Sequence, residues 1–192
     1  MRPRTWLLPI ALLAGAGLAA CGGGQTFPPP SPSEDPAQVT WNLEPGGLRY
    51  RLAASPDLNL DDGHPLGLTV CVYQLADLEK FQDMASSSEG VDRLLDCSAE
   101  VAGARTARRH FLQPGEERLV TTDRAEKARY LAVAAGYSHR QADMCSAIQP
   151  FPVSRGSRGV IFRTTVYSAA PLDAIIHCTE SAVTITGVNR EQ

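Results

Sequence analysis

The chain has 192 residues, of which 43% are apolar, 20% charged and 6% aromatic. These proportions fit one ordinary globular domain and exclude a disordered or collagen-like chain. The formal net charge is −3, and it becomes −5 once residues 1–20 are removed, because Arg2 and Arg4 leave with them. Nucleic acid requires a basic surface. We therefore expect no nucleic-acid binding.

The N-terminus has the parts of a secretory signal peptide. Residues 1–4 carry two arginines, residues 6–18 are mostly apolar, and two alanines precede Cys21. The apolar stretch is shorter than the roughly 20 residues that span a bilayer. A cysteine at this position is similar to the lipobox cysteine of bacterial lipoproteins, which carries acyl chains. We predict that residues 1–20 are removed and that Cys21 is the lipid attachment site; the alternative is a plain secretory signal. Gly22, which is not an aspartate, indicates the outer membrane.

A linker follows the predicted attachment site. Residues 21–38 comprise Cys21 and a stretch that begins with glycines, continues with prolines and contains one aromatic residue. Such a segment behaves as a tether with a typical reach of roughly 20 Å. We expect the folded domain to comprise residues 39–192.

Four further cysteines, Cys71, Cys97, Cys145 and Cys178, would be exported with the chain. An even number in an oxidising compartment favours two disulfides. The absence of a C-x-x-C pair argues against zinc. Three pairings are possible. We favour Cys71–Cys97 and Cys145–Cys178, because each closes one local excursion of the chain.

Alternating apolar and polar residues predict strands through most of the domain. Leu48, Tyr50 and Leu52 alternate with Arg49 and Arg51, as in a half-buried strand. The expected strands cover residues 48–52, 66–75, 106–113, 117–122, 129–138, 160–168 and 182–188. Residues 139–158 are expected to form an irregular loop, and residues 172–177 a helical turn.

Both faces of the expected strand 66–75 are partly apolar, so a second layer should cover it. Asp77 can cap a short helix in which Phe81 and Met84 have helical spacing. A second helical stretch up to Cys97 would bring that cysteine back near Cys71. The fold class predicted is therefore all-β, a sandwich of about seven strands with a small helical insertion.

The loop from Asp57 to Gly63 looks like a calcium loop, but it fails the EF-hand pattern. The sixth and twelfth positions, which need Gly and Glu, hold Asp62 and Leu68. We predict an ordinary polar loop in which Gly63 takes a positive φ. No metal and no cofactor are expected.

Catalytic motifs are missing from the sequence. The four histidines, His64, His110, His139 and His177, are scattered, and each is expected at the surface or in a turn. We find no nucleophile elbow or phosphate loop and predict that the protein is not an enzyme. A hydrolase whose site is assembled from distant residues is a further alternative. The pairs Arg108-Arg109 and Arg155-x-x-Arg158 could meet an acidic partner or lipid headgroups, but solvated strand ends are the preferred interpretation.

The lipobox, the Pro-rich tether and the run from Ser55 to Leu75 together resemble the TssJ (SciN) family, the outer-membrane lipoproteins of type VI secretion systems. The family pattern has an Asn after the first strand, a Gly and a Pro in the next loop, and a strand ending in Tyr-Gln-Leu. Here these are Asn59, Gly63, Pro65 and the end of the run at Leu75. The resemblance implies a transthyretin-like β-sandwich at the periplasmic face of the outer membrane.

The resemblance also implies a partner, the periplasmic C-terminal domain of TssM, and through it TssL. The partner-binding loop carried over by position includes Asp57, Leu58, Asn59, Leu60, Asp61, Asp62, Gly63 and Pro65. For Asn59, Gly63 and Pro65 a role in turn geometry is preferred over direct contact. Leu58 and Leu60 could be binding anchors or could tuck into the sandwich. A different hypothesis is a transthyretin-like periplasmic lipoprotein that binds a small ligand or a cell-wall fragment, for which an apolar pocket would be required.

Overall fold

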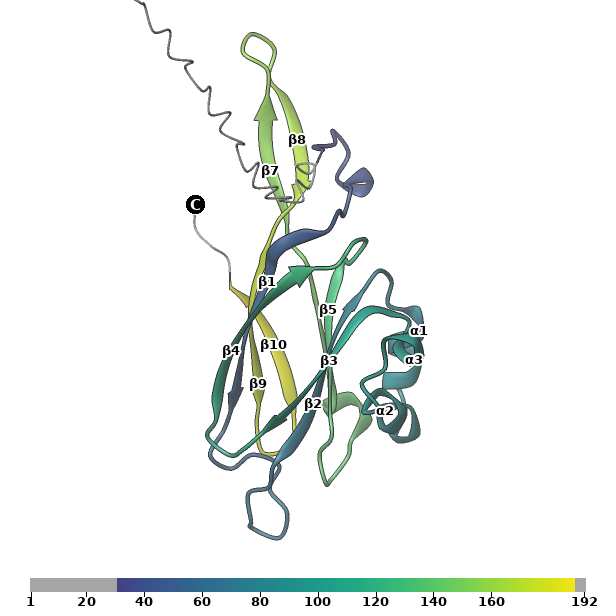
Figure 1. Ribbon diagram of the computed structural model, residues 1–192, viewed down its shortest axis with the longest axis vertical. Coiled ribbons are helices and arrows are strands. Elements are labelled where there is room, and N and C mark those ends of the chain that lie inside the picture. Colours follow the sequence, from purple (N-terminus) through teal and green to yellow (C-terminus); the bar gives the residue numbers. More distant parts are fainter. Residues whose placement is uncertain (1–30, 189–192) are drawn as a thin grey trace, which may run out of the picture.

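The structure of the protein, a computed structural model, describes residues 31–188. They form two four-stranded sheets and a separate two-stranded hairpin (Figure 1). The sheets pack as a sandwich with helices to one side, which confirms the predicted fold class. The predicted signal peptide, Cys21 and residues 22–30 of the tether lie outside the described residues. Between residues 31 and 188, no helix is long and apolar enough to cross a membrane.

The first sheet has the order β10-β9-β1-β4 and the second the order β3-β2-β5-β6. The strands are β1 (Glu44–Ala54), β2 (Leu68–Leu75), β3 (Ala104–Leu112), β4 (Glu117–Arg124), β5 (Tyr130–Ala135), β6 (Ser146–Pro150), β7 (Val153–Arg158), β8 (Thr164–Ala169), β9 (Leu172–Cys178) and β10 (Val183–Val188). Strands β1 and β9 run parallel, whereas the other pairs are antiparallel. Parallel neighbours need a long crossover, and here that crossover builds the second sheet and the hairpin.

The core between the sheets follows from the alternation in β1. Leu48, Tyr50 and Leu52 are buried, whereas Arg49 and Arg51 are exposed. The buried side chains pack in one cluster with the inward-facing residues of β2, β5 and β9. Burial of apolar surface of this kind is the main stabilising contribution to a folded domain. The predicted half-buried strand is confirmed.

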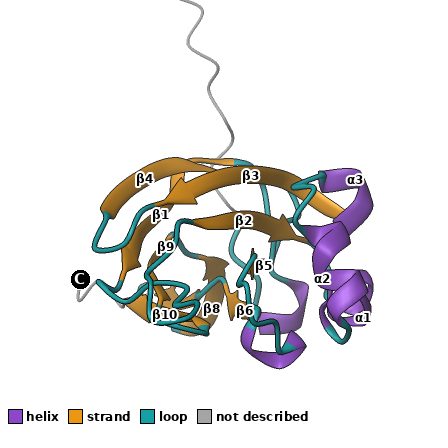
Figure 2. Cartoon of the chain, turned by 90° about the horizontal axis from the view of Figure 1, so that it is seen from below, coloured by secondary structure: helices purple, strands orange, loops and turns teal. Residues whose placement is uncertain are grey.

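Three short helices cover the other face of β2: α1 (Glu79–Ala85), α2 (Ser88–Leu94) and α3 (Ala99–Ala102). Figure 2 shows them together beside the second sheet. Tyr73 of β2 packs edge-on against Phe81 of α1 with ring centroids 5.7 Å apart, and its hydroxyl donates to the carbonyl oxygen of Leu94. The helical insertion is therefore confirmed. The start of α1 differs from prediction, because Leu78 rather than Asp77 is its N-terminal capping residue.

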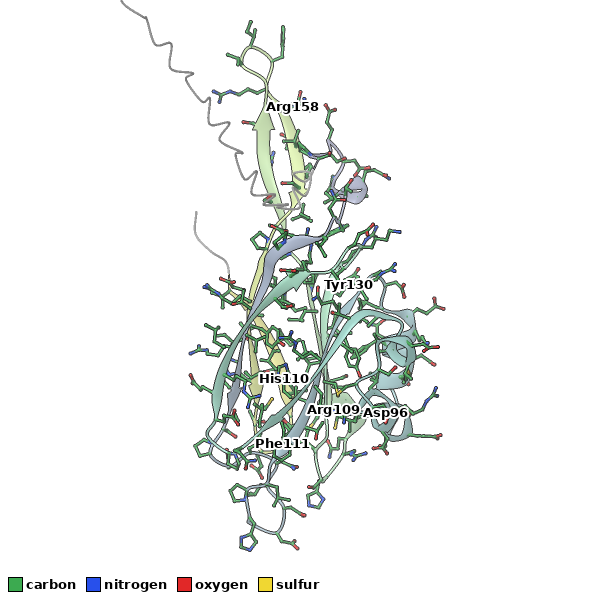
Figure 3. The ribbon with its side chains drawn as sticks, in the orientation of Figure 1. Asp96, Arg109, His110, Phe111, Tyr130 and Arg158 are labelled. Carbon is green, nitrogen blue, oxygen red and sulfur yellow. A yellow bond between two sulfur atoms is a disulfide. The ribbon has the colours of Figure 1, made fainter. Side chains whose placement is uncertain are left out.

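A disulfide fixes the insertion to the sheet. Cys71 of β2 is bonded to Cys97, which follows α2, with a Cα–Cα distance of 5.3 Å. Arg109 of β3 donates to the carbonyl oxygens of Leu95 at 3.1 Å and Asp96 at 2.8 Å (Figure 3). A cation at the C-terminal end of a helix satisfies carbonyl groups that have no partner within the helix. Arg109 thus helps to hold the insertion.

The second predicted disulfide is not formed. Cys145 and Cys178 are both buried free thiols. Cys178 belongs to β9 of the first sheet, whereas Cys145 immediately precedes β6 of the second. Burial in the same core cluster is the main cause that raises the pKa of Tyr137, and Cys178 and Cys145 add smaller contributions. The prediction rested on loop closure along the chain, which does not specify the sheet to which each cysteine belongs.

The C-terminal third differs most from the prediction. The expected loop 139–158 contains β6 and β7, and the expected helical turn 172–177 is strand β9. Hydrogen-bonding partners on both sides, β1 and β10, override the local helical spacing of that segment. The expected strand 160–168 begins only at Thr164, because the chain reverses at the tip of the β7–β8 hairpin.

Candidate partner-binding surface

The predicted binding segment is the β1–β2 loop, which we define as residues 55–67. It lies at the end of the sandwich opposite the β7–β8 hairpin (Figure 1). Two neighbouring turns support its backbone. The amide of Gly115, in the β3–β4 turn, donates to Ser55 O at 3.0 Å. The amides of Asn59 and Leu60 each donate, at 3.2 Å, to carbonyl oxygens of the β9–β10 turn. The loop is therefore held against two other connections.

Leu58 is a core residue and not a binding anchor. Its side chain is 0% exposed and belongs to the cluster between the sheets. The amide of Leu66 donates to Leu58 O at 3.0 Å, which closes the base of the loop. Leu58 and Leu60 were predicted either to bind the partner or to pack in the sandwich, and Leu58 packs in the sandwich. Leu60 is only partly buried.

Asn59 connects three segments through its side chain. Its Nδ2 donates to Gly67 O at 3.1 Å, and its Oδ1 accepts from the amide of Ser138 at 2.7 Å. The residue is buried and has a φ of +46°. Asn tolerates this left-handed conformation better than most residues with a side chain. These contacts give Asn59 the structural role that was the preferred interpretation.

The tip of the loop is exposed and carries charge. The amides and carbonyls of Asp61 and His64 exchange hydrogen bonds of 2.9 and 3.0 Å, which makes a tight turn. Asp62 and Gly63 within it have φ values of +48° and +78°. The carboxylate of Asp61 also lies 2.8 Å from Nε2 of His139 in the β5–β6 connection. As predicted, Gly63 has a positive φ.

The surface offers two kinds of contact. Asp57 and Asp62 present exposed carboxylates. Beside the loop, Phe111 on the outward face of β3 is 56% exposed, and the edge of its ring covers Gly67, where a Cβ would lie 2.5 Å from Cζ. Leu66 is also exposed. Aromatic side chains in a polar surface are frequent in protein interfaces. We did not predict Phe111, although period-2 spacing between buried His110 and Leu112 points it outward.

Residues 47–162 match the model of the type VI secretion lipoprotein family T6SS-SciN, which includes VasD, EvfM and TssJ. The matched segment is more than half of the chain and contains the β1–β2 loop and the helical insertion. The chain belongs to the type VI secretion lipoprotein family. The resemblance found in the sequence is therefore confirmed. A comparison with curated protein sequences gives no match.

Solved structures have the same fold as this type VI secretion lipoprotein. TssJ1 from Pseudomonas aeruginosa is 21% identical with a TM-score of 0.56, over 78% of this chain and 98% of that one. A structure described as the T6SS protein TssM C-terminal domain from EAEC is 18% identical with a TM-score of 0.53, over 73% of this chain and 98% of that one. Lip from Serratia marcescens is described as a membrane-bound component of the type VI secretion system. It is 19% identical with a TM-score of 0.50, over 75% of this chain and 99% of that one.

The lipoprotein also has a cleft that bears on the small-ligand alternative. It lies between the edge strands β3 and β4 and has a volume of about 300 Å³, at the lower limit for ligand pockets. Its buried polar side chain, Gln74, donates to Asp123 O at 2.9 Å and accepts from the amide of Ala125 at 2.8 Å. The side-chain amide of Gln74 therefore already has partners within the protein. The β1–β2 loop is the stronger candidate for a functional site.

His110 of the lipoprotein is buried, contrary to the prediction that it lies at the surface or in a turn. It belongs to the inward face of β3, and its Nε2 lies 2.8 Å from the hydroxyl of Tyr50. Burial, together with the positive charges of Arg118 and Arg108, lowers the pKa of His110 to about 4. Neutral imidazole can accept a hydrogen bond from the tyrosine. His110 is thus a core residue.

The calcium-like sequence of the loop does not build an ion site. Asn59, at the third position of that pattern, uses its amide to bind the protein backbone. In the described part of the chain, no three His, Cys, Asp or Glu side chains come together in a way that could hold a metal ion.

Proposed function

We propose that this type VI secretion lipoprotein is anchored by acyl chains on Cys21 at the periplasmic face of the outer membrane and binds the periplasmic C-terminal domain of TssM through its β1–β2 loop. Through TssM it would be connected to TssL. The observation that carries the proposal is a rigid, acidic loop at the end of the sandwich remote from the start of the described chain. Its role would be to hold a complex at the membrane without catalysis.

The direction of the chain supports this arrangement. Ser33, close to the start of the described residues, pairs with Tyr167 of β8 through backbone hydrogen bonds of 2.9 and 2.7 Å. The β1–β2 loop is at the opposite end (Figure 1). An acylated Cys21 would therefore lie on the side of the hairpin, and the loop would face the periplasm.

The rigidity of the loop favours binding. Ordering a mobile segment on association costs free energy, and a preorganised surface reduces that cost. The backbone of the loop is already held by the β3–β4 and β9–β10 turns, and Asn59 connects it to Ser138. The exposed carboxylates of Asp57 and Asp62 would attract a basic partner, and Phe111 would supply apolar contact. The loop is thus suited to recognition.

Acyl chains would supply the membrane affinity. One chain gives marginal, reversible attachment, whereas two or more hold stably. Attachment to one surface also raises the effective concentration of the partner sites there. The lipid and the loop therefore contribute separately: one determines where the protein is, and the other determines what it holds.

The experiment is a binding measurement between the mature chain and the TssM periplasmic C-terminal domain of the same bacterium. Replacing Asp57, Asp61 and Asp62 together by asparagine should slow association about tenfold and weaken its salt dependence. The matched control replaces three exposed carboxylates beside and in α1, as Asp77→Asn, Glu79→Gln and Asp83→Asn.

The control carries the same change of net charge on a different face, and it should bind like the wild type. Absence of binding by the wild-type chain would contradict the proposed function. Equal association rates for the loop variant and the control would locate the interface elsewhere.

A further inference from the structure

The tip of the β7–β8 hairpin exposes three consecutive apolar residues. Val160, Ile161 and Phe162 are 96%, 87% and 86% exposed. Isolated surface apolar residues are common, but a contiguous apolar group marks a membrane or protein contact. The β1–β2 loop lies at the other end of the molecule, so this group does not belong to the proposed TssM surface. The group is therefore a candidate for a second, separate contact.

The shape of the tip is fixed by Gly159. This residue has a φ of +102°, and a Cβ at this position would lie 2.1 Å from Phe162 O. Only glycine fits such a turn. The chain reverses here, so the three apolar side chains occupy the far end of a hairpin that projects from the sandwich (Figure 1). They are consequently the first part of this end to meet a surface.

The hairpin is basic immediately behind the tip. Arg155, Arg158 and Arg163 are exposed, and the sequence from residue 151 to residue 172 contains no Asp or Glu. Figure 3 shows Arg158 on the hairpin. Long basic side chains next to apolar ones are typical of interfacial membrane segments, because the apolar groups enter the acyl region while the cations contact phosphate. Anionic lipids attract each such cation.

The start of the described chain lies at the base of the same hairpin, where Ser33 pairs with Tyr167. The tip at Ile161 is six residues from Tyr167, or up to about 20 Å along an extended strand. Cys21 is ten residues before Ser31, and such a segment can span at most about 35 Å. A lipid on Cys21 and the tip of the hairpin can therefore reach the same bilayer surface.

We propose that Val160, Ile161 and Phe162 insert into the phospholipid surface to which the chain is attached, with Arg155, Arg158 and Arg163 on its phosphate groups. The proposal rests on the proposed acylation of Cys21. The hairpin gives the protein a second membrane contact, in addition to the lipid on Cys21. Two contacts fix the orientation of the sandwich, so that the β1–β2 loop points away from the membrane.

Tryptophan fluorescence of the acylated protein in vesicles of phosphatidylethanolamine and phosphatidylglycerol tests this. The Phe162→Trp variant should be quenched by lipids with bromine on the acyl chains. The Phe111→Trp variant is the matched control, because Phe111 is also exposed but lies towards the other end of the molecule (Figure 3). It should be unquenched, as should the background from Trp41 in the wild type.

Vesicle affinity of the non-acylated mature chain, made as Cys21→Ser, gives a second measurement. Ile161→Asp should weaken binding about tenfold, as expected for the loss of one inserted side chain. Replacing Arg158 and Arg163 by serine should weaken binding to phosphatidylglycerol vesicles about fivefold for each arginine. The same arginine variant should bind neutral phosphatidylcholine vesicles as the parent chain does.

Absence of quenching in the acylated, vesicle-bound Phe162→Trp variant would overturn the hairpin proposal and leave the anchor at Cys21 intact. Acylated protein that detaches from vesicles, with both tryptophan variants unquenched, would overturn the hairpin and the anchor together. An unquenched Phe162→Trp variant in vesicles, together with a shift in its emission when the TssM domain is added without vesicles, would identify the tip as a protein contact, and the membrane proposal would be wrong.

Discussion

Replacing Asn59 by alanine tests whether the β1–β2 loop is held rigid by this side chain. The change removes the hydrogen bonds to Gly67 O and from the amide of Ser138, each with a net contribution of about 1 kcal/mol. Alanine at a φ of +46° adds a conformational cost of about 1 kcal/mol. The free energy of unfolding should therefore fall by about 3 kcal/mol.

Urea unfolding of the mature chain, followed by circular dichroism, measures this change. Asn59→Gly separates the two terms, because glycine loses the hydrogen bonds but accepts the positive φ, and it should cost about 2 kcal/mol. Asp57→Ala, at an exposed position of the same loop, should change the free energy of unfolding by less than about 0.5 kcal/mol.

The same variants separate stability from recognition. Asn59→Ala should weaken TssM binding through loss of loop order, and Asn59→Gly should weaken it too. An Asn59→Ala variant with the wild-type urea midpoint would show that this side chain does not hold the loop. If that stable variant also lost TssM binding, Asn59 would contact the partner directly and would not act through the loop.

Three further predictions concern the core and the disulfide. Cys97→Ser opens a loop with a sequence separation of 26 and should lower the free energy of unfolding by about 3.5 kcal/mol; an unchanged urea midpoint would contradict the Cys71–Cys97 bond. Burial raises the pKa of Cys145, and that of Cys178 to about 12, so both thiols should resist a maleimide in the native acylated protein and react in denaturant, as counted by mass spectrometry. Fewer than two additions in denaturant would indicate the missing disulfide. Below pH 6.5 the unfolded chain protonates His110 while the folded chain keeps it neutral down to about pH 4, so stability should fall by up to about 3 kcal/mol across this interval. The His110→Gln variant should lose that part of the pH dependence. Identical pH profiles of stability for the wild type and the variant would refute the role of His110.

Local sequence patterns were sufficient to predict those parts of the fold that depend on the periodicity of a single strand or helix. The alternation of Leu48, Tyr50 and Leu52 predicts the inward face of β1, and the helical spacing of Phe81 and Met84 predicts the insertion. The cover on the second face of β2 also brings Cys97 to Cys71. Each of these inferences needs only periodicity and a short connection.

Long-range pairing is what the sequence could not supply. The segment from Leu172 to Cys178 has helical spacing, yet it pairs with β1 across more than a hundred residues and becomes β9. Sequence separation likewise does not determine whether the sulfurs of Cys145 and Cys178 meet, and both are buried free thiols. The apolar run at Val160 predicts the start of a strand, whereas the turn at Gly159 places that run in solvent at the tip of the hairpin.

The candidate binding loop was chosen from the resemblance, but the roles of its residues needed the structure. Leu58 could be assigned to the core only when its burial was known, and Asn59 only when Ser138 was found beside it. Period-2 spacing indicates that Phe111 points outward from its strand. Nothing in the sequence, however, places β3 next to the β1–β2 loop.

In the proposed function, one molecule holds the membrane at one end and TssM at the other. The most direct measurement is the amount of TssM that cofractionates with outer membranes from cells that carry wild-type protein, Cys21→Ser, or the Asp57, Asp61 and Asp62 asparagine variant. TssM should be retained by the wild type and lost with either variant, while purified Cys21→Ser protein still binds the TssM domain in solution. Retention of TssM at wild-type levels with Cys21→Ser would contradict the proposal that the lipid on this protein holds TssM at the outer membrane.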